Sequence, residues 1–156
     1  TSQALCWTLY LLDKHKSEGW WERLRDEVVG VAGPTAVPTY EQVTQQMPTV
    51  MSVLLESLRL FPPVPGLARE AVREVTLTRQ DGTKLVIPAG CGVAISFVRL
   101  HLDERLWDEP NAFKPDRFAA GASKSLRHPM AFSPFSAGRR NCIGQQFALL
   151  EARMAL

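Results

Sequence analysis

The chain has 156 residues, of which 46% are hydrophobic and 22% are charged. This length fits a single domain, and this composition supports a packed core and excludes a disordered chain. The formal net charge of +2 is too small to indicate a nucleic-acid partner, and no stretch combines clustered basic residues with spaced aromatic ones.

The three cysteines, Cys6, Cys91 and Cys142, are an odd number at wide spacing. This excludes a disulfide framework and a Cys-x-x-Cys metal pair, and it suits a reducing compartment. No apolar run approaches the roughly 20 residues that a membrane-spanning helix needs. The chain begins at Thr1 rather than Met and already inside a helical pattern. We therefore expect it to be the C-terminal part of a longer protein.

Two helices are predicted at the beginning of the chain. Residues 1–16 are apolar on more than one face, which predicts a helix buried on all sides, and basic residues 14–16 suit its C-terminus. Residues 20–30 repeat the helical period. The apolar face predicted for this second helix consists of Trp21, Leu24 and Val28.

A short helix and a long helix follow. Thr39 and Gln42 fit a capping box, and the longer helix is predicted to start at Pro48 and to end before Pro62. Within it, Glu56 and Arg59 are three residues apart and share one face. An exposed pair of this kind would contribute only about 0.3–0.5 kcal/mol, whereas a buried pair needs further polar partners.

From residue 64 to residue 98 the hydrophobic period changes from helical to alternating. Asp81-Gly82 between two β-rich runs predicts a hairpin, and residues 93–98 are ambiguous between strand and helix. The fold class predicted is therefore mainly α with a small antiparallel β-sheet. We interpret His101 as a hydrogen-bonded structural histidine, since no second histidine stands at metal-ligand spacing. Residues 119–128 are small, polar and basic, which predicts an exposed loop.

The stretch most informative about function surrounds Cys142, which precedes a predicted helix at residues 145–156. A thiol at a helix start faces unpaired N–H groups and the positive end of the helix dipole. Both favour the thiolate, which is the form that binds metal. Gly138 permits a positive φ, Gly144 permits close packing at the helix start, and Arg140 can donate to a carboxylate. The alternative is a small cysteine of the hydrophobic core.

Phe135-x-x-Gly138-x-Arg140-x-Cys142-x-Gly144 closely resembles the haem-binding loop of the cytochrome P450 superfamily, the haem-thiolate monooxygenases. Glu56-x-x-Arg59 resembles the Glu-x-x-Arg helix of that family. Its completing arginine would be Arg117, in Pro115-Asp116-Arg117-Phe118. The resemblance covers essentially the whole chain, with the motifs in the family's order. It implies that residues 1–156 are the C-terminal portion of a single cytochrome P450 domain.

The resemblance also implies a cofactor and roles for individual residues. Haem b would be held by Cys142 as axial ligand, with Phe135 as its shield and Arg140 on a propionate. Arg69 is a second candidate for a propionate, or else an exposed strand charge. Thr1 would help deliver protons during oxygen activation, or is an exposed terminal residue. Glu56, Arg59 and Arg117 would form a buried structural triad, with a solvated surface pair as the alternative.

The activity implied is insertion of one oxygen atom of O2 into a C–H bond of a lipophilic substrate, most similar to the fatty-acid ω-hydroxylase branch. Val64, Pro65, Gly66 and Leu67 would lie near the substrate. Electrons would come from NADPH-cytochrome P450 reductase or another donor, because the chain has no nicotinamide or flavin fingerprint. A eukaryotic full-length protein would sit on the cytoplasmic face of the endoplasmic reticulum membrane.

Two alternatives remain open. One is a non-oxygenating haem-thiolate isomerase or dehydratase, although its haem loop usually departs from this pattern. The other is a haem-binding sensor or degenerate member without turnover. We expect the 156-residue chain on its own to be inactive, because the family's distal haem wall is implied to lie outside it.

Overall fold

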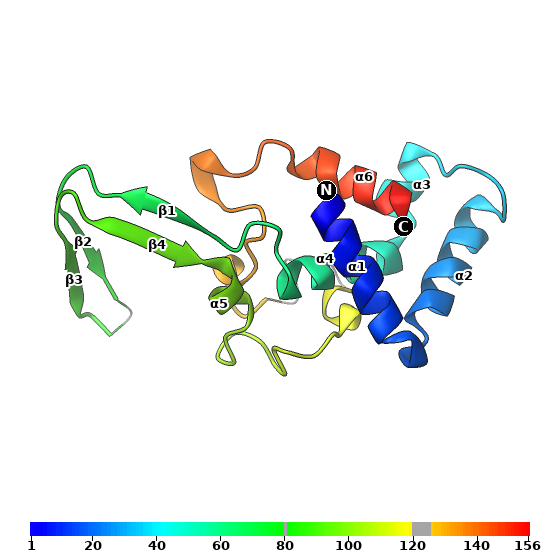
Figure 1. Cartoon of the computed structure of the whole chain (residues 1–156), viewed down its shortest axis with the longest axis horizontal. Coiled ribbons are helices and arrows are strands. Elements are labelled where there is room, and N and C mark those ends of the chain that lie inside the picture. The colour runs from blue at the N-terminus through cyan, green and yellow to red at the C-terminus, as the bar shows by residue number, and fades with distance from the viewer. Residues whose placement is uncertain (80, 120–125) are drawn as a thin grey trace.

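The computed structural model describes residues 1–79, 81–119 and 126–156. It is mainly helical with two small antiparallel sheets, which confirms the predicted fold class. Residues 120–125 of the predicted exposed loop lie outside this description. The helices are α1 (Ser2–Lys14), α2 (Trp20–Ala32), α3 (Tyr40–Gln45), α4 (Pro48–Leu60), α5 (Phe97–His101) and α6 (Gln145–Ala155). The strands are β1 (Gly66–Glu70), β2 (Val75–Thr78), β3 (Lys84–Ile87) and β4 (Gly92–Ser96). In Figure 1 the strands extend away from the helices, with β2 and β3 at the far end.

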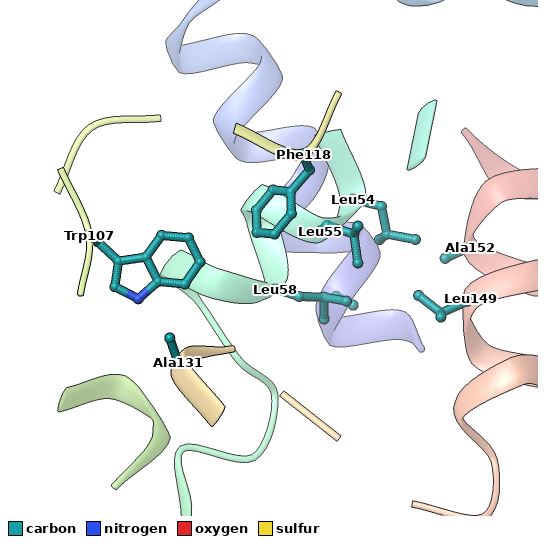
Figure 2. Packing of buried hydrophobic residues seen from close by; sticks show 9 residues of the cluster. Leu54, Leu55, Leu58, Trp107, Phe118, Ala131, Leu149 and Ala152 are labelled. Carbon is teal, nitrogen blue, oxygen red and sulfur yellow. The ribbon is translucent and has the colours of Figure 1, made fainter. Parts of the chain in front are cut away.

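Helix α4 is the central element of the fold. It begins at Pro48 and ends before Pro62, as predicted, because proline suits a first helical turn and cannot continue a helix. It contributes to two buried hydrophobic clusters. Leu54, Leu55 and Leu58 belong to the first cluster, and Figure 2 shows them between Trp107 and Phe118 on one side and Leu149 and Ala152 of α6 on the other. Val50 and Val53 belong to the second cluster, together with Leu11, Leu12, Trp20, Leu24, Val43, Met47 and Phe113.

The expectation that the first helix is buried on all sides is wrong for this chain. Helix α1 packs against α4 and α6, and it buries only the face that carries Ala4, Thr8, Leu11 and Leu12. Its other apolar residues Trp7, Leu9 and Tyr10 are exposed. Its end at Lys14 agrees with the predicted basic C-terminus.

Helix α2 also differs in detail from the prediction. The buried aromatic residue is Trp20, whereas Trp21 is 36% exposed. Trp20 and Leu24 are four residues apart and therefore share a helix face, and this is the face that α2 buries. A third side chain of this helix, Glu27, accepts hydrogen bonds from the amides of Thr49 and Val50 at 2.8 and 3.0 Å. It thereby satisfies free N–H groups at the start of α4. The predicted capping box of Thr39 and Gln42 is present at the start of α3.

The strands form two nested hairpins. β1 pairs with β4 in the register Gly66 to Ser96 and Glu70 to Gly92, and β2 pairs with β3. The β2–β3 turn contains Gly82 at φ 80°, which agrees with the Asp81-Gly82 prediction. The ambiguous segment 93–98 is a strand up to Ser96 and a helix from Phe97 onward. β4 ends at Ser96, whose hydroxyl accepts the amide of Arg99 at 3.2 Å and caps α5. In the described ranges, every helix falls short of the length and apolar character needed to cross a bilayer.

Candidate cofactor and active site

The loop that carries Cys142 is closed by a backbone hydrogen bond. The Cys142 amide donates to the carbonyl of Phe135 at 2.9 Å, so that the six residues between them form a compact excursion. Gly138 adopts φ 75°, as the sequence predicts, and begins a short 3₁₀ helix (Gly138–Arg140). Gly144 occupies the N-cap position of α6. Cys142 therefore lies at the N-terminal end of α6, as predicted.

Cys142 lines a cavity of about 380 Å³. This volume lies within the range of small-molecule sites in proteins, and the lining is mostly apolar. Segments far apart in the sequence meet around it: the start of α1, the middle of α4, β1, the Cys142 loop and α6. The predicted site residues that the structure brings together here are Thr1, Val64, Leu67, Arg69, Phe135, Arg140 and Cys142.

Four helices supply the apolar wall of this cavity, which sequence reasoning missed. Leu54 and Leu58 of α4 are four residues apart and present one face to the cavity. The other apolar lining residues from helices are Ala4, Phe97, Ala148, Leu149 and Ala152. The helical spacing of Leu54 and Leu58 is visible in the sequence, but it indicates a buried face and not what that face contacts. Their place in the cavity depends on the packing of α4 against α1 and α6.

Four of the residues predicted to lie at the cofactor or the substrate are not among those that line the cavity: Pro65, Gly66, Gly138 and Gly144. The Pro65 carbonyl accepts the amides of Phe97 and Val98 at 2.8 and 3.3 Å, which ties β1 to α5. A Cβ at Gly66 would collide with the carbonyl oxygen of Ile95, so the close pairing of β1 with β4 requires glycine there. Gly138 and Gly144 shape the backbone on either side of Cys142, and a Cβ at Gly144 would lie 4.0 Å from the Cys142 sulfur.

The polar groups at the cavity are few. Arg69 lies on β1 and Arg140 on the Cys142 loop, and both residues line the cavity. Arg69 also donates to the carbonyl of Ala68 at 2.8 Å. Thr1 is the N-cap residue of α1, but its side chain makes no capping hydrogen bond. Ser136 also lines the cavity, so the arrangement combines one sulfur, two cations and the hydroxyls of Thr1 and Ser136 with apolar walls.

The Glu56–Arg59 pair is fully buried, and Arg59 uses all five of its N–H donors. Its Nε and Nη2 atoms each donate to the Glu56 carboxylate at 2.8 Å. The remaining donors bind three backbone carbonyls, those of His101 at 2.9 Å, Pro110 at 2.6 Å and Ala112 at 3.0 Å. Burial of this ion pair is tolerated because every donor has a partner.

The third arginine of the predicted triad meets the same carboxylate. Arg117 Nε donates to Glu56 Oε1 at 3.3 Å, and its Nη2 donates to the carbonyl of Glu109 at 2.8 Å. The Lys114 amide also donates to Glu56 Oε1, at 2.9 Å. The arginine of α4 and the segment from residue 109 to residue 117 are therefore joined through one buried carboxylate. The side chain of Arg117 is itself partly exposed.

His101 is a structural histidine in the described part of the chain, as predicted. Its ring is fully buried and both nitrogens are hydrogen-bonded. The Ser133 amide donates to Nε2 at 2.9 Å, so Nδ1 carries the proton and donates to the carbonyl of Arg59 at 3.1 Å. Burial lowers the pKa of His101 to about 4, and the nearby Arg59 charge acts in the same direction, against the hydrogen bond to the Arg59 carbonyl. The ring is therefore neutral at pH 7.

The donor set of the cavity fits an iron porphyrin. The iron of a porphyrin needs a ligand from the protein, which the Cys142 sulfur would provide. The apolar faces of the porphyrin suit the leucine, alanine and phenylalanine walls, and its propionates suit Arg69 and Arg140.

Comparisons with known proteins agree with this fit. The family description Cytochrome P450 matches residues 1–156. Cytochrome P450 4A24 of Sus scrofa is 40% identical over all of this chain and Cytochrome P450 4A11 of Homo sapiens 41% identical over 99% of it. Cytochrome P450 734A1 of Arabidopsis thaliana is 40% identical over all of it. The chain spans 28–29% of the length of these curated relatives.

A solved structure gives the same result for the fold. The heme domain of cytochrome P450DA superposes with a TM-score of 0.84 at 34% sequence identity, over 97% of this chain and 32% of that one. Membership of this family implies haem. By its sequence over its whole length, the chain belongs to the cytochrome P450 family.

Proposed function

We propose that residues 1–156 form the C-terminal portion of a single cytochrome P450 domain, and that the whole protein inserts one oxygen atom of O2 into a C–H bond of a lipophilic substrate. The observation that carries this proposal is the cavity in which Cys142, Arg140, Arg69 and Thr1 meet among apolar walls. When bound there, haem b supplies the oxygen-activating chemistry, and the protein supplies binding, orientation and protons.

Each polar group then has one task. The Cys142 sulfur would hold the haem iron, and backbone amides at the start of α6 would stabilise its negative charge. Arg140 and Arg69 bind the propionates, and Phe135 keeps water from the sulfur. The Thr1 hydroxyl, which is not engaged in capping α1, holds and passes a proton on the substrate side. Glu56, Arg59 and Arg117 are structural and keep the segment around Lys114 in place.

The substrate proposed is a fatty acid or another lipid. Val64 and Leu67 line the cavity beside Leu54 and Leu58, and these side chains offer only apolar contacts. A relative that is 38% identical over the whole chain, from Sus scrofa, is named a taurochenodeoxycholic 6 alpha-hydroxylase, which supports a lipophilic substrate. We assign NADPH-cytochrome P450 reductase or another external donor as the electron source. For a eukaryotic full-length protein, we assign the cytoplasmic face of the endoplasmic reticulum membrane as the location.

The test uses the whole haem-loaded protein with a reductase, NADPH and a panel of fatty acids and bile acids. The proposal predicts a hydroxylated product that depends on NADPH and carries oxygen from isotopically labelled O2. Turnover of a lipid hydroperoxide without NADPH and without uptake of labelled O2 would instead indicate an isomerase or dehydratase. Tight lipid binding without any product would indicate a sensor.

A pair of variants tests the role of Thr1. Thr1→Ala removes the hydroxyl and is expected to lower product formed per NADPH by about a hundredfold, the lower end of general acid–base effects. Thr1→Ser retains the hydroxyl and is the matched control, with a ratio close to that of the unchanged protein. Equal ratios in both variants would assign Thr1 to the surface rather than to the chemistry.

A further inference from the structure

His101 joins two parts of the molecule that the sequence does not connect. Its Nε2 accepts the Ser133 amide at 2.9 Å, and its Nδ1 donates to the Arg59 carbonyl at 3.1 Å. Arg59 in turn donates to the carbonyl of His101 at 2.9 Å. Because the ring is fully buried, water cannot replace any of these partners. The buried network around Arg59 is thereby tied to the segment that enters the Cys142 loop.

Ser133 is the last buried residue before that loop. Its carbonyl accepts the Ser136 amide at 3.0 Å, which closes a turn that contains Phe135. The Phe135 carbonyl then accepts the Cys142 amide at 2.9 Å. A shift of the Ser133 backbone would therefore move the group that holds Cys142.

One residue of this turn, Ser136, has an unfavourable backbone conformation. Ser136 has φ 64°, in the left-handed region that is unfavourable for residues other than glycine. Such a conformation persists only where the surrounding structure determines it. The Ser133 anchor on His101 provides this constraint at the buried end of the turn.

The ring of His101 is held in one orientation. It packs near the rings of Phe97 and Phe132, with centroid distances of 6.4 and 5.4 Å. Its lowered pKa keeps Nε2 unprotonated at pH 7, so that this atom can accept the Ser133 N–H. His101 is not among the residues that line the cavity, whereas Phe97 is.

We propose that His101 is a positioning residue that fixes the Cys142 loop through its hydrogen bond to the Ser133 amide, and so sets how the sulfur is presented to the cofactor. The link from the loop to the cofactor rests on the function proposed above. The link from His101 to the loop stands on the contacts of the protein alone.

Two variants test the hydrogen bonds of the two ring nitrogens of His101 separately. His101→Gln retains an acceptor near the position of Nε2 and gives up the donor to Arg59. His101→Asn retains a donor near the position of Nδ1 and gives up the acceptor for Ser133. Chemical denaturation of both proteins provides the stability baseline, because each loses one buried hydrogen bond.

The readouts are hydrogen exchange at the Ser133 amide and the Soret band of the reduced carbon monoxide complex of the whole haem-loaded protein. In His101→Asn, exchange is expected to rise by at least about tenfold, as loss of a buried hydrogen bond allows. Part of the Soret absorption is expected to move from the position of thiolate-ligated haem to that of haem without a thiolate ligand. In His101→Gln, both readouts are expected to stay close to those of the unchanged protein.

Unchanged exchange and an unchanged band in His101→Asn would overturn the inference. Equal changes in both variants, in proportion to lost stability, would also overturn it. If a variant does not fold, a measurement on the unchanged protein still tests the inference. Nitrogen NMR of His101 should show the neutral ring protonated on Nδ1. Protonation on Nε2 would refute the inference. If the unchanged protein had no thiolate-type band, the proposed function would fail while exchange still tested the loop anchor.

Discussion

Arg59 and His101 each donate a hydrogen bond to the other's backbone carbonyl, at 2.9 and 3.1 Å. Both side chains are fully buried, so removal of either one leaves unpaired polar groups on two segments at once. Through Arg59 the pair reaches Glu56 and the carbonyls of Pro110 and Ala112, and through His101 it reaches Ser133. This connection ties α4, which is far from Cys142 in the sequence, to the segment that enters the Cys142 loop.

Replacing Arg59 by lysine should strongly destabilise the protein. Lysine retains the charge but has a single nitrogen, which cannot satisfy the Glu56 carboxylate and three carbonyls together. Breaking a buried pair in this way costs about 3–5 kcal/mol of the free energy of unfolding. Urea denaturation of the whole protein measures this loss.

Arg23→Lys is the matched control for that experiment. Arg23 pairs with Asp116 at 2.9 Å on the surface, where both side chains are largely exposed. Such a pair contributes at most about 1 kcal/mol. A similar loss at both positions would show that burial of Arg59 has no special consequence, contrary to our account.

The low pKa of His101 predicts a stability that depends on pH. The folded protein binds the proton with a pKa of about 4, below the ordinary value of 6.5, so the unfolded chain binds it first as the pH falls. The free energy of unfolding should therefore be unaffected by this group above pH 6.5 and decrease between pH 6.5 and 4, by about 3 kcal/mol in total. Comparing denaturation of the unchanged protein with that of His101→Asn across this pH range isolates the contribution of His101 to the free energy of unfolding. An equally steep decrease in the variant would exclude His101 as its source.

Glu27 should stabilise α4 from outside that helix. Its carboxylate accepts the amides of Thr49 and Val50, and it also places a negative charge near the helix N-terminus. Glu27→Ala is expected to lower the free energy of unfolding by about 1–2 kcal/mol, as loss of a helix cap does. Asp26→Ala removes an exposed neighbouring carboxylate and should have a much smaller effect. Equal effects would argue against capping across the two helices.

Two glycines of the β1–β4 hairpin provide a steric test. Gly66→Ala would press a methyl group against the carbonyl oxygen of Ile95, whereas Gly92→Ala meets nothing within 4 Å. The first substitution is expected to cost about 1–3 kcal/mol and to displace Leu67, which lines the cavity. It should weaken binding of lipophilic ligands to the whole protein, measured by spectral titration. Weaker binding in Gly92→Ala as well would remove the special role of Gly66.

Local patterns in the sequence predicted the elements with local causes. Pro48, the capping box of Thr39 and the turn at Gly82 each act within a few residues, and the structure has all three features. The ordered motif around Cys142 was informative for the same reason, because its turn and helix start are local.

What the sequence did not predict depends on packing between distant segments. The exposed face of α1, with Trp7 and Tyr10, depends on which elements cover the helix, and a hydrophobic pattern does not specify them. Choosing Trp21 over Trp20 for the buried face of α2 was a one-residue error in helical phase. The bond from His101 to Ser133 spans 32 residues and involves a backbone amide, which has no sequence signature.

The most direct test of the account is the absorption spectrum of the reduced carbon monoxide complex of the whole protein and of its Cys142→Ser variant. The unchanged protein should show the red-shifted Soret band of thiolate-ligated haem, and the variant should lose it. Cys91→Ser, at an exposed cysteine that does not line the cavity, should keep the band. Survival of the band in Cys142→Ser would contradict the assignment of this sulfur as the axial ligand.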